Sequence, residues 1–174
     1  MCHRDQFRSQ PQCHHKNEVI MKNRDQLLGE IRYAIRLTQR TARLYRRVQT
    51  TGVFLSIIGG SATMAALANG TPAWLTSAGG ILLAVAGAML IAVRPADKAA
   101  QNESDIRRYQ SLMARAVSMN DKELEQALED THNGDAPEIE PLRDVAYNDV
   151  VLELNRPDVL VPLSPIQKIL RALA

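Results

Sequence analysis

Five side chains that could bind a transition metal lie close together near the N-terminus, and they are Cys2, His3, Cys13, His14 and His15. Thiolate and imidazole groups are the ligands of tetrahedral zinc sites. Their spacing does not match that of structural zinc sites, and the segment holds few apolar residues that could order it. We therefore expect residues 1–21 to form a disordered basic and His-rich tail without a bound metal. The sequence does not distinguish Met1 from Met21 as the start of the chain.

A second group combines two carboxylates with a phenol, as acid–base sites do, and consists of Asp144, Tyr147 and Asp149. These residues lie on an expected helix whose other face is apolar, so solvated charges account for them. The sequence holds neither a glycine-rich phosphate loop nor a nucleophile elbow. It therefore predicts no catalytic or cofactor-binding residues and a protein that is not an enzyme.

The central 46 residues, 48–93, contain no Asp, Glu, Lys, Arg or His. Asn69, Gly70 and Pro72 are typical of a turn and divide this stretch into residues 48–68 and 74–93. At 1.5 Å per residue, each half can cross the roughly 30 Å core of a bilayer. A hairpin buried in a soluble protein would normally carry a polar stripe, and a signal peptide would lie nearer the N-terminus. The stretch therefore predicts a two-span transmembrane hairpin.

Basic residues flank the predicted hairpin on both sides. Residues 1–47 hold eleven Lys and Arg against four Asp and Glu, whereas the turn at 69–74 has no charge. Because positive flanks stay on the cytoplasmic side, we expect a multi-pass protein of the inner membrane with both termini in the cytoplasm. The membrane-flanking basic residues are Arg36, Arg40, Arg43, Arg46, Arg47, Arg94 and Lys98.

Both predicted spans are rich in small residues, and seven of the nine glycines lie in the stretch. Projected on a helix, these residues share one arc in each span, and in the second span Leu83 and Leu90 are expected to point away from it. Small faces let helix backbones approach closely in lipid, so the arcs could pack the hairpin, join copies into a homo-oligomer or line a weakly selective pore. The arcs consist of Gly52, Ser56, Gly59, Gly60 and Thr63 in the first span and Thr76, Ser77, Gly80, Ala84, Gly87 and Ala88 in the second.

The arginines that precede the hairpin form a stripe along a predicted helix. We interpret this stripe as a solvated face that also orients the hairpin, with the anionic headgroups of the bilayer as an alternative partner. Aromatic residues that could stack on bases are not interleaved with it, so no nucleic acid is expected as a partner.

Helices are expected on both sides of the hairpin. Apolar residues recur with helical spacing before it and again in a helix over residues 97–119. Short connections would bring these two helices together through Leu28, Ile31 and Ile35 on the first and Ile106, Tyr109 and Leu112 on the second. Further helices are expected from Asn120 to Gly134, from Pro141 to Leu154 and after Ser164.

The fold class predicted from these patterns is an all-α membrane protein, a two-span transmembrane hairpin with long cytoplasmic helices that form a small bundle. Its expected parts are the tail at 1–21, a basic helix at 22–47, the hairpin at 48–93 and a C-terminal helical domain at 94–174. Residues 94–174 carry a net charge of −5 and residues 1–47 one of +7, which favours their docking.

This organisation, with RRYQSL at 107–112 and LRDVAYND at 142–149, resembles the SLATT group of two-transmembrane effector domains, which associate with SMODS and SLOG proteins. The resemblance covers roughly residues 22–172. It implies a role in prokaryotic anti-phage or conflict systems, a signal-sensing or nucleotide-synthesising partner protein, and perforation of the inner membrane. The group has no catalytic motif to transfer to this chain.

Three functions follow from these observations. The first is a pore-forming effector that oligomerises through its hairpin and permeabilises the membrane. The second is a phage holin-like lysis protein, although the acidic helical C-terminal region is longer than the short basic tail usual there. The third is a non-catalytic membrane scaffold or adaptor.

Overall fold

The computed structural model describes residues 22–70 and 72–174, and within this part of the chain all regular secondary structure is helical. The helices follow one another in this order: α1 (Arg24–Asn69), α2 (Ala73–Val93), α3 (Pro95–Arg115), the 3-10 turn η1 (Ala116–Ser118), α4 (Asp121–His132), η2 (Glu140–Leu142), α5 (Arg143–Glu153), η3 (Pro157–Val159) and α6 (Pro165–Leu173).

Helix α1 is the central element, and its 46 residues extend over roughly 69 Å without a break. At its start, the Gln26 side chain accepts a hydrogen bond of 3.1 Å from the backbone N–H of Asn23. At its end, Gly70 adopts the left-handed conformation with φ of 60° and caps the helix. The first half of α1 is polar and basic, and the second half belongs to the charge-free stretch.

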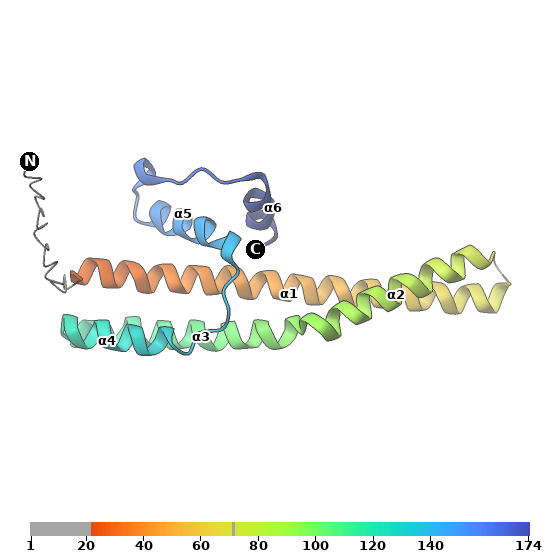
Figure 1. Cartoon of the computed structure of the whole chain (residues 1–174), viewed down its shortest axis with the longest axis horizontal. Coiled ribbons are helices and arrows are strands. Elements are labelled where there is room, and N and C mark those ends of the chain that lie inside the picture. The colour runs from red at the N-terminus through yellow and green to blue at the C-terminus, as the bar shows by residue number, and fades with distance from the viewer. Residues whose placement is uncertain (1–21, 71) are drawn as a thin grey trace, which may run out of the picture.

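Helix α2 returns alongside the second half of α1 and forms with it an apolar hairpin (Figure 1). Both α1 and α2 contain segments that are long and apolar enough to cross a membrane. The chain then breaks at Arg94, a non-glycine residue with φ of 47°, because Pro95 disfavours helical geometry in the residue that precedes it. Helix α3 starts at Pro95 and continues along the polar half of α1.

The polar half of α1 is covered on two sides. Helices α3 and α4 lie along one side, and α5 and α6 lie on the other (Figure 1). The first side has an apolar core, here called the α3–α4 cluster, which consists of Leu27, Ile31, Ala34, Tyr109, Leu112, Ala116, Leu124 and Leu128. The second side has a smaller core, the C-terminal cluster, built on Leu37, Leu142, Ala146 and Ala174.

Three of the predicted helix boundaries can be compared directly with the structure. Capping boxes start α4 at Asn120 and α6 at Ser164, which confirms both predicted starts. Pro141, however, lies in η2, so α5 begins two residues later than predicted, at Arg143.

Candidate functional site

The apolar hairpin is held together by close contact between glycines of its two helices. A Cβ atom built on Gly59 would lie 2.8 Å from the carbonyl oxygen of Gly79, and one built on Gly79 would lie 2.8 Å from Oγ1 of Thr63. The two backbones therefore touch at this level. Further along, Gly52 faces the side chain of Leu90, where an added Cβ would come within 2.6 Å. Without these glycines the helices could not approach so closely.

On α1 this contact uses the small residues predicted from the sequence. Gly52 and Gly59 are buried, and Ser56, Gly60 and Thr63 are half-buried. The hydroxyls of Ser56 and Thr63 donate to the carbonyl oxygens four residues earlier, at 2.9 and 2.8 Å, so they need no water to satisfy them. Thr63 lies against α2, with its Oγ1 2.8 Å from the Cβ position of Gly79.

On α2 the contact face differs from the predicted arc. The buried residues are Gly79 and Ala86, with Leu90 beside them, and none of these three belongs to that arc. Of the two leucines predicted to point away from the arc, Leu90 packs its side chain against Gly52 of α1. Leu83 is 40% exposed, although its backbone lies against Gly59. A projection of one helix cannot show which of two small faces meets its neighbour.

The predicted arc of α2 therefore points outward. A Cβ atom added to Gly80 or Gly87 would have no neighbouring atom within 4 Å, and Ala84 and Ala88 are exposed. Thr76 is half-buried and Ser77 is exposed, with its hydroxyl donating to the carbonyl oxygen of Ala73 at 2.9 Å. We call Gly80, Ala84, Gly87 and Ala88 the outer small face. It lies roughly 120° around α2 from the face that meets α1.

The predicted pairing of α1 with α3 is present at most of its positions. Ile31, Tyr109 and Leu112 are fully buried in the α3–α4 cluster, and Leu28 and Ile35 are partly buried against it. Ile106 is only half-buried and lies outside the cluster. The cluster also includes Leu124 and Leu128 of α4. The contribution of α4 was not predicted, because spacing within one helix does not show how many partners it has.

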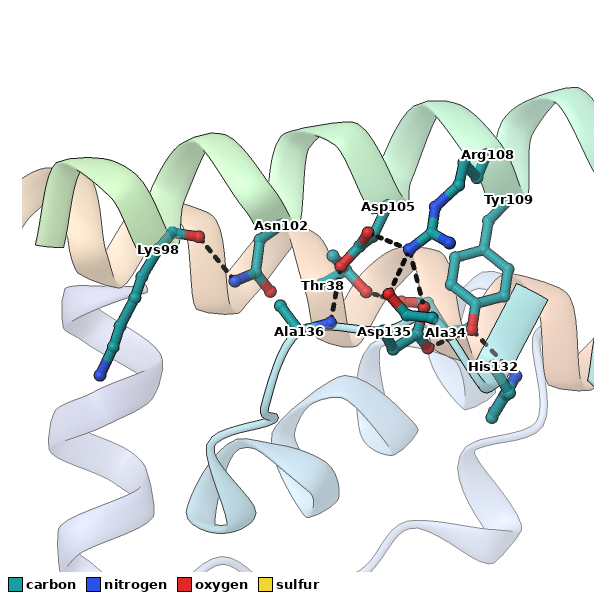
Figure 2. A network of polar contacts seen from close by, with 11 residues as sticks. Ala34, Thr38, Lys98, Asn102, Asp105, Arg108, Tyr109, His132, Asp135 and Ala136 are labelled. Carbon is teal, nitrogen blue, oxygen red and sulfur yellow. Dashed lines mark hydrogen bonds and ion pairs between the residues drawn. The ribbon is translucent and has the colours of Figure 1, made fainter. Parts of the chain in front are cut away.

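A polar network closes the end of the α3–α4 cluster (Figure 2). The hydroxyl of Tyr109 lies 2.9 Å from Nδ1 of His132 and donates to the carboxylate of Asp135. Arg108 donates to Asp105 and, at 2.7 Å, to the carbonyl oxygen of Gly134. Asp105 also accepts from the backbone N–H of Ala136 at 3.0 Å. The network thereby attaches the segment that follows α4 to α3.

Burial determines the ionisation of this network. It raises the pKa of Tyr109, and the hydrogen bond to Asp135 raises that pKa further. Burial also raises the pKa of Asp135, although the hydroxyl of Tyr109 and the nearby His132 and Arg108 act in the opposite direction. One oxygen of Asp135 is buried without a hydrogen-bond partner and lies 3.6 Å from Arg108. The raised pKa keeps the Tyr109 hydroxyl protonated, so that it can donate to Asp135.

The arginine stripe of α1 holds the C-terminal helices in place. Arg40 forms an ion pair of 2.7 Å with Asp149 on α5, and both side chains are about four-fifths buried. Arg36 pairs with Glu153 at 2.6 Å, and Arg47 donates to the carbonyl oxygen of Ala172 at 2.8 Å. The interpretation of the stripe as a solvated face is therefore wrong for Arg40. The acidic partners come from distant positions in the sequence, so the stripe alone could not reveal them.

The other predicted flanking residues lie around the same level of α1. Arg46 pairs with Glu103 on α3 at 2.6 Å, and the ammonium group of Lys98 lies 5.4 Å from the ring centre of Tyr45. Arg43 and Arg94 are exposed. Within residues 22–70 and 72–174 Arg43 has no ion pair, which makes it a natural control for Arg40.

Replacing Arg40 with alanine should loosen α5 and α6 from α1. The change leaves the carboxylate of Asp149 partly buried without its partner and removes the hydrogen bond to the carbonyl oxygen of Arg171. We expect a loss of roughly 1–3 kcal/mol. Limited proteolysis of the full chain should then cut residues 143–174 faster in Arg40→Ala than in Arg43→Ala. Equal rates in the two variants would show that the ion pair does not hold this layer.

Of the residues considered for chemistry, Asp144 and Asp149 have polar partners, whereas Tyr147 is exposed. Asp149 is bound to Arg40, and Asp144 accepts from Nε2 of Gln167 at 2.7 Å. The Cys and His cluster at residues 2–15 lies outside the described residues. Within residues 22–70 and 72–174, no group of three or more His, Cys, Asp or Glu side chains could hold a metal ion.

Comparison with protein-family models, with curated proteins and with solved structures gave no match. The resemblance to the SLATT group therefore depends on sequence features and organisation alone. In the part of the chain that it describes, the structure shows an all-helical protein with two helices long and apolar enough to cross a membrane.

Proposed function

We propose that this protein is an integral inner-membrane effector that inserts the α1–α2 hairpin into the bilayer, oligomerises and permeabilises the membrane. Insertion is supported by the 46 charge-free residues, which form two antiparallel helices of bilayer length. Large apolar side chains cover the outside of this hairpin, among them Phe54, Ile57 and Ile81, which are more than half exposed. Such a surface is suited to lipid and unsuited to water.

Charges at the polar end of the hairpin support its orientation. Arg43, Arg46, Arg47, Arg94 and Lys98 lie where α1 enters and α2 leaves the charge-free stretch, and the turn between the helices has no charged residue. By the positive-inside rule, the polar helices and both ends of the described chain lie in the cytoplasm.

The observation that carries oligomerisation is the outer small face of α2. The hairpin packs through Gly79 and Ala86, so Gly80, Ala84 and Gly87 remain available to a second copy. In lipid, helices associate through close packing at small residues and not through the hydrophobic effect. Copies joined in this way would form a homo-oligomer whose shared surface can open a pore.

The polar helices provide a route for control. Because α1 is continuous from Arg24 to Asn69, a movement of its cytoplasmic half would be passed directly to the hairpin. Helix α2 is separated from α3 by the break at Arg94, so it can turn relative to the cytoplasmic layer. A signal-sensing or nucleotide-synthesising partner protein would act on this layer.

Enlarging the outer small face should abolish assembly and leakage. In the double variant Ala84→Leu, Gly87→Leu, the added side chains would keep copies apart. The control variant Ala78→Leu enlarges an exposed residue on another face of α2. We expect crosslinked oligomers and dye release from vesicles to be lost in the double variant and kept in Ala78→Leu, at equal amounts of inserted protein.

Persistence of both oligomers and release in the double variant would contradict this assembly surface. Insertion without any release by the unaltered protein, in the presence of its partner, would instead favour the scaffold function.

A further inference from the structure

Helix α6 has one strongly apolar face that stays largely exposed in the described part of the chain. Ile166, Ile169 and Leu173 are 66%, 61% and 46% exposed, and their spacing of three and four residues places them on the same side of the helix. Leu170 lies at the edge of this face and packs against the C-terminal cluster. The helix itself is well defined, because Ser164 and Gln167 form a capping box and Pro165 occupies its first turn.

The structure holds α6 at the level where the charge-free stretch begins. Arg40 and Arg47 donate to the carbonyl oxygens of Arg171 and Ala172, at 3.2 and 2.8 Å. Arg47 is the last charged residue before that stretch. Near the other end of α6, Gln167 is bound to Asp144 in the first turn of α5. Both ends are therefore fixed to the same layer, and α6 runs across the direction of α1 (Figure 1).

The apolar face of α6 points toward the hairpin. Leu173 lines an apolar hollow of about 330 Å³ together with Val48, Gly52 and Leu55 of α1 and Met89 of α2. Since Ile166 and Ile169 share the face of Leu173, they extend this apolar surface sideways from the hairpin. The surface is continuous with the part of the chain proposed to enter lipid.

The charges on α6 indicate what lies against it. Its two charged residues, Lys168 and Arg171, are both basic and exposed, and Arg43 is exposed at the same level of α1. Lys168 and Arg171 both lie on the side of the helix opposite its apolar face. An apolar face combined with a basic polar face is typical of helices that lie in the plane of a membrane surface.

We propose that α6 is an interfacial helix whose Ile166, Ile169 and Leu173 side chains lie at the boundary of headgroups and acyl chains in the cytoplasmic leaflet. The occupant of this face is thus the same bilayer that holds the hairpin, with Lys168 and Arg171 on the opposite, cytoplasmic side of the helix. This inference depends on the proposed membrane insertion and adds a second, separate membrane contact to it. The C-terminal layer would then be tied both to α1, through Arg40 and Arg47, and to the membrane surface.

The test measures how deeply single positions of the full chain lie in the bilayer. Cys2 and Cys13 are replaced by serine, and one cysteine is introduced as Ile169→Cys, Lys168→Cys or Phe54→Cys and labelled with an environment-sensitive fluorophore. The protein is reconstituted in vesicles of phosphatidylethanolamine and phosphatidylglycerol with a nitroxide on the lipid, placed near the headgroup or deep in the acyl chain. Ile169, Lys168 and Phe54 are all exposed, so the labels should not disturb the fold.

At position 169 we expect the shallow nitroxide to remove most of the fluorescence. At position 168, on the polar side of the helix, it should remove little. At position 54 the deep nitroxide should quench. Quenching at 54 without quenching at 169 would overturn the proposal that α6 is an interfacial helix, and would leave insertion of the hairpin intact. Absence of quenching at 54 would overturn insertion itself.

Self-quenching between labels at 169, without lipid quenching, would show that a second copy covers this face, and would also overturn the proposal. As a second measurement, Ile166→Ser with Ile169→Ser should increase the rate at which trypsin cuts after Lys168 in vesicles, but not in detergent. An equal effect in both media would mean that the two isoleucines stabilise the fold and do not contact the bilayer.

Discussion

Replacing Ile31 with aspartate should unfold the contact between α1 and the α3–α4 layer. Ile31 is fully buried among Tyr109, Leu112 and Leu124. The variant loses the packing of a large aliphatic side chain and places a carboxyl group in an apolar environment. Together these effects should cost roughly 3–5 kcal/mol. Thermal unfolding of the full chain in detergent, followed by circular dichroism and proteolysis, measures the loss.

Gln110→Asp is the matched control for Ile31→Asp, because Gln110 is exposed on α3 beside Tyr109 and also gains a carboxylate. We expect this variant to unfold within about 0.5 kcal/mol of the unaltered protein. The hairpin should remain inserted in both, since residues 48–93 are unchanged. If Ile31→Asp keeps the proteolytic stability of the unaltered protein, α1 does not pack against α3 and α4 in this way.

Replacing Gly59 with leucine should separate the two helices of the hairpin. The added Cβ would meet the carbonyl oxygen of Gly79 and the backbone nitrogen of Leu83, both at 2.8 Å. Backbone atoms of a regular helix cannot move aside as a flexible side chain can, so the helices themselves must shift. Overpacking of this kind costs about 1–3 kcal/mol, and the full leucine side chain should bring the loss to the upper part of that range.

Disulfide formation between Gly60→Cys and Leu83→Cys reports this separation, because the Cβ position of residue 60 lies 3.9 Å from the Leu83 side chain and neither change crowds the contact at Gly79. The pair should crosslink rapidly in the unaltered background and slowly with Gly59→Leu. Gly87→Leu serves as the control, since nothing lies within 4 Å of its Cβ position. Rapid crosslinking in Gly59→Leu would show that the hairpin does not close through Gly59.

The two glycine substitutions also separate folding of the hairpin from assembly. Gly59→Leu acts within one chain, whereas Gly87→Leu leaves the hairpin intact and acts on the outer small face. If the two faces of α2 have different roles, both Gly59→Leu and Gly87→Leu should lose leakage. Only Gly59→Leu should also lose the intramolecular crosslink. A single small face serving both would give the same result for both variants.

Local patterns in the sequence determined the helices of this protein. The charge-free stretch with Asn69 and Gly70 near its middle specifies two long apolar helices and the turn between them, because length and absence of charge are properties of the chain alone. Asn120 and Ser164 likewise start α4 and α6 through hydrogen bonds within four residues. Pairing of Ile31 with Tyr109 and Leu112 could also be predicted, since short connections leave few alternatives.

Only the tertiary structure decided which faces of those helices meet. Helix α2 has two small faces of similar composition. The structure pairs Gly79 with Gly59 and Leu90 with Gly52, so the face that contains Gly79 is the one that meets α1. The role of Arg40 depends on Asp149, more than one hundred residues later, so its spacing on α1 is equally compatible with solvent, headgroups or an ion pair. The apolar side of α6 could be recognised in the sequence, but its placement beside Arg47 and the start of the charge-free stretch follows from long-range contacts that no local pattern encodes.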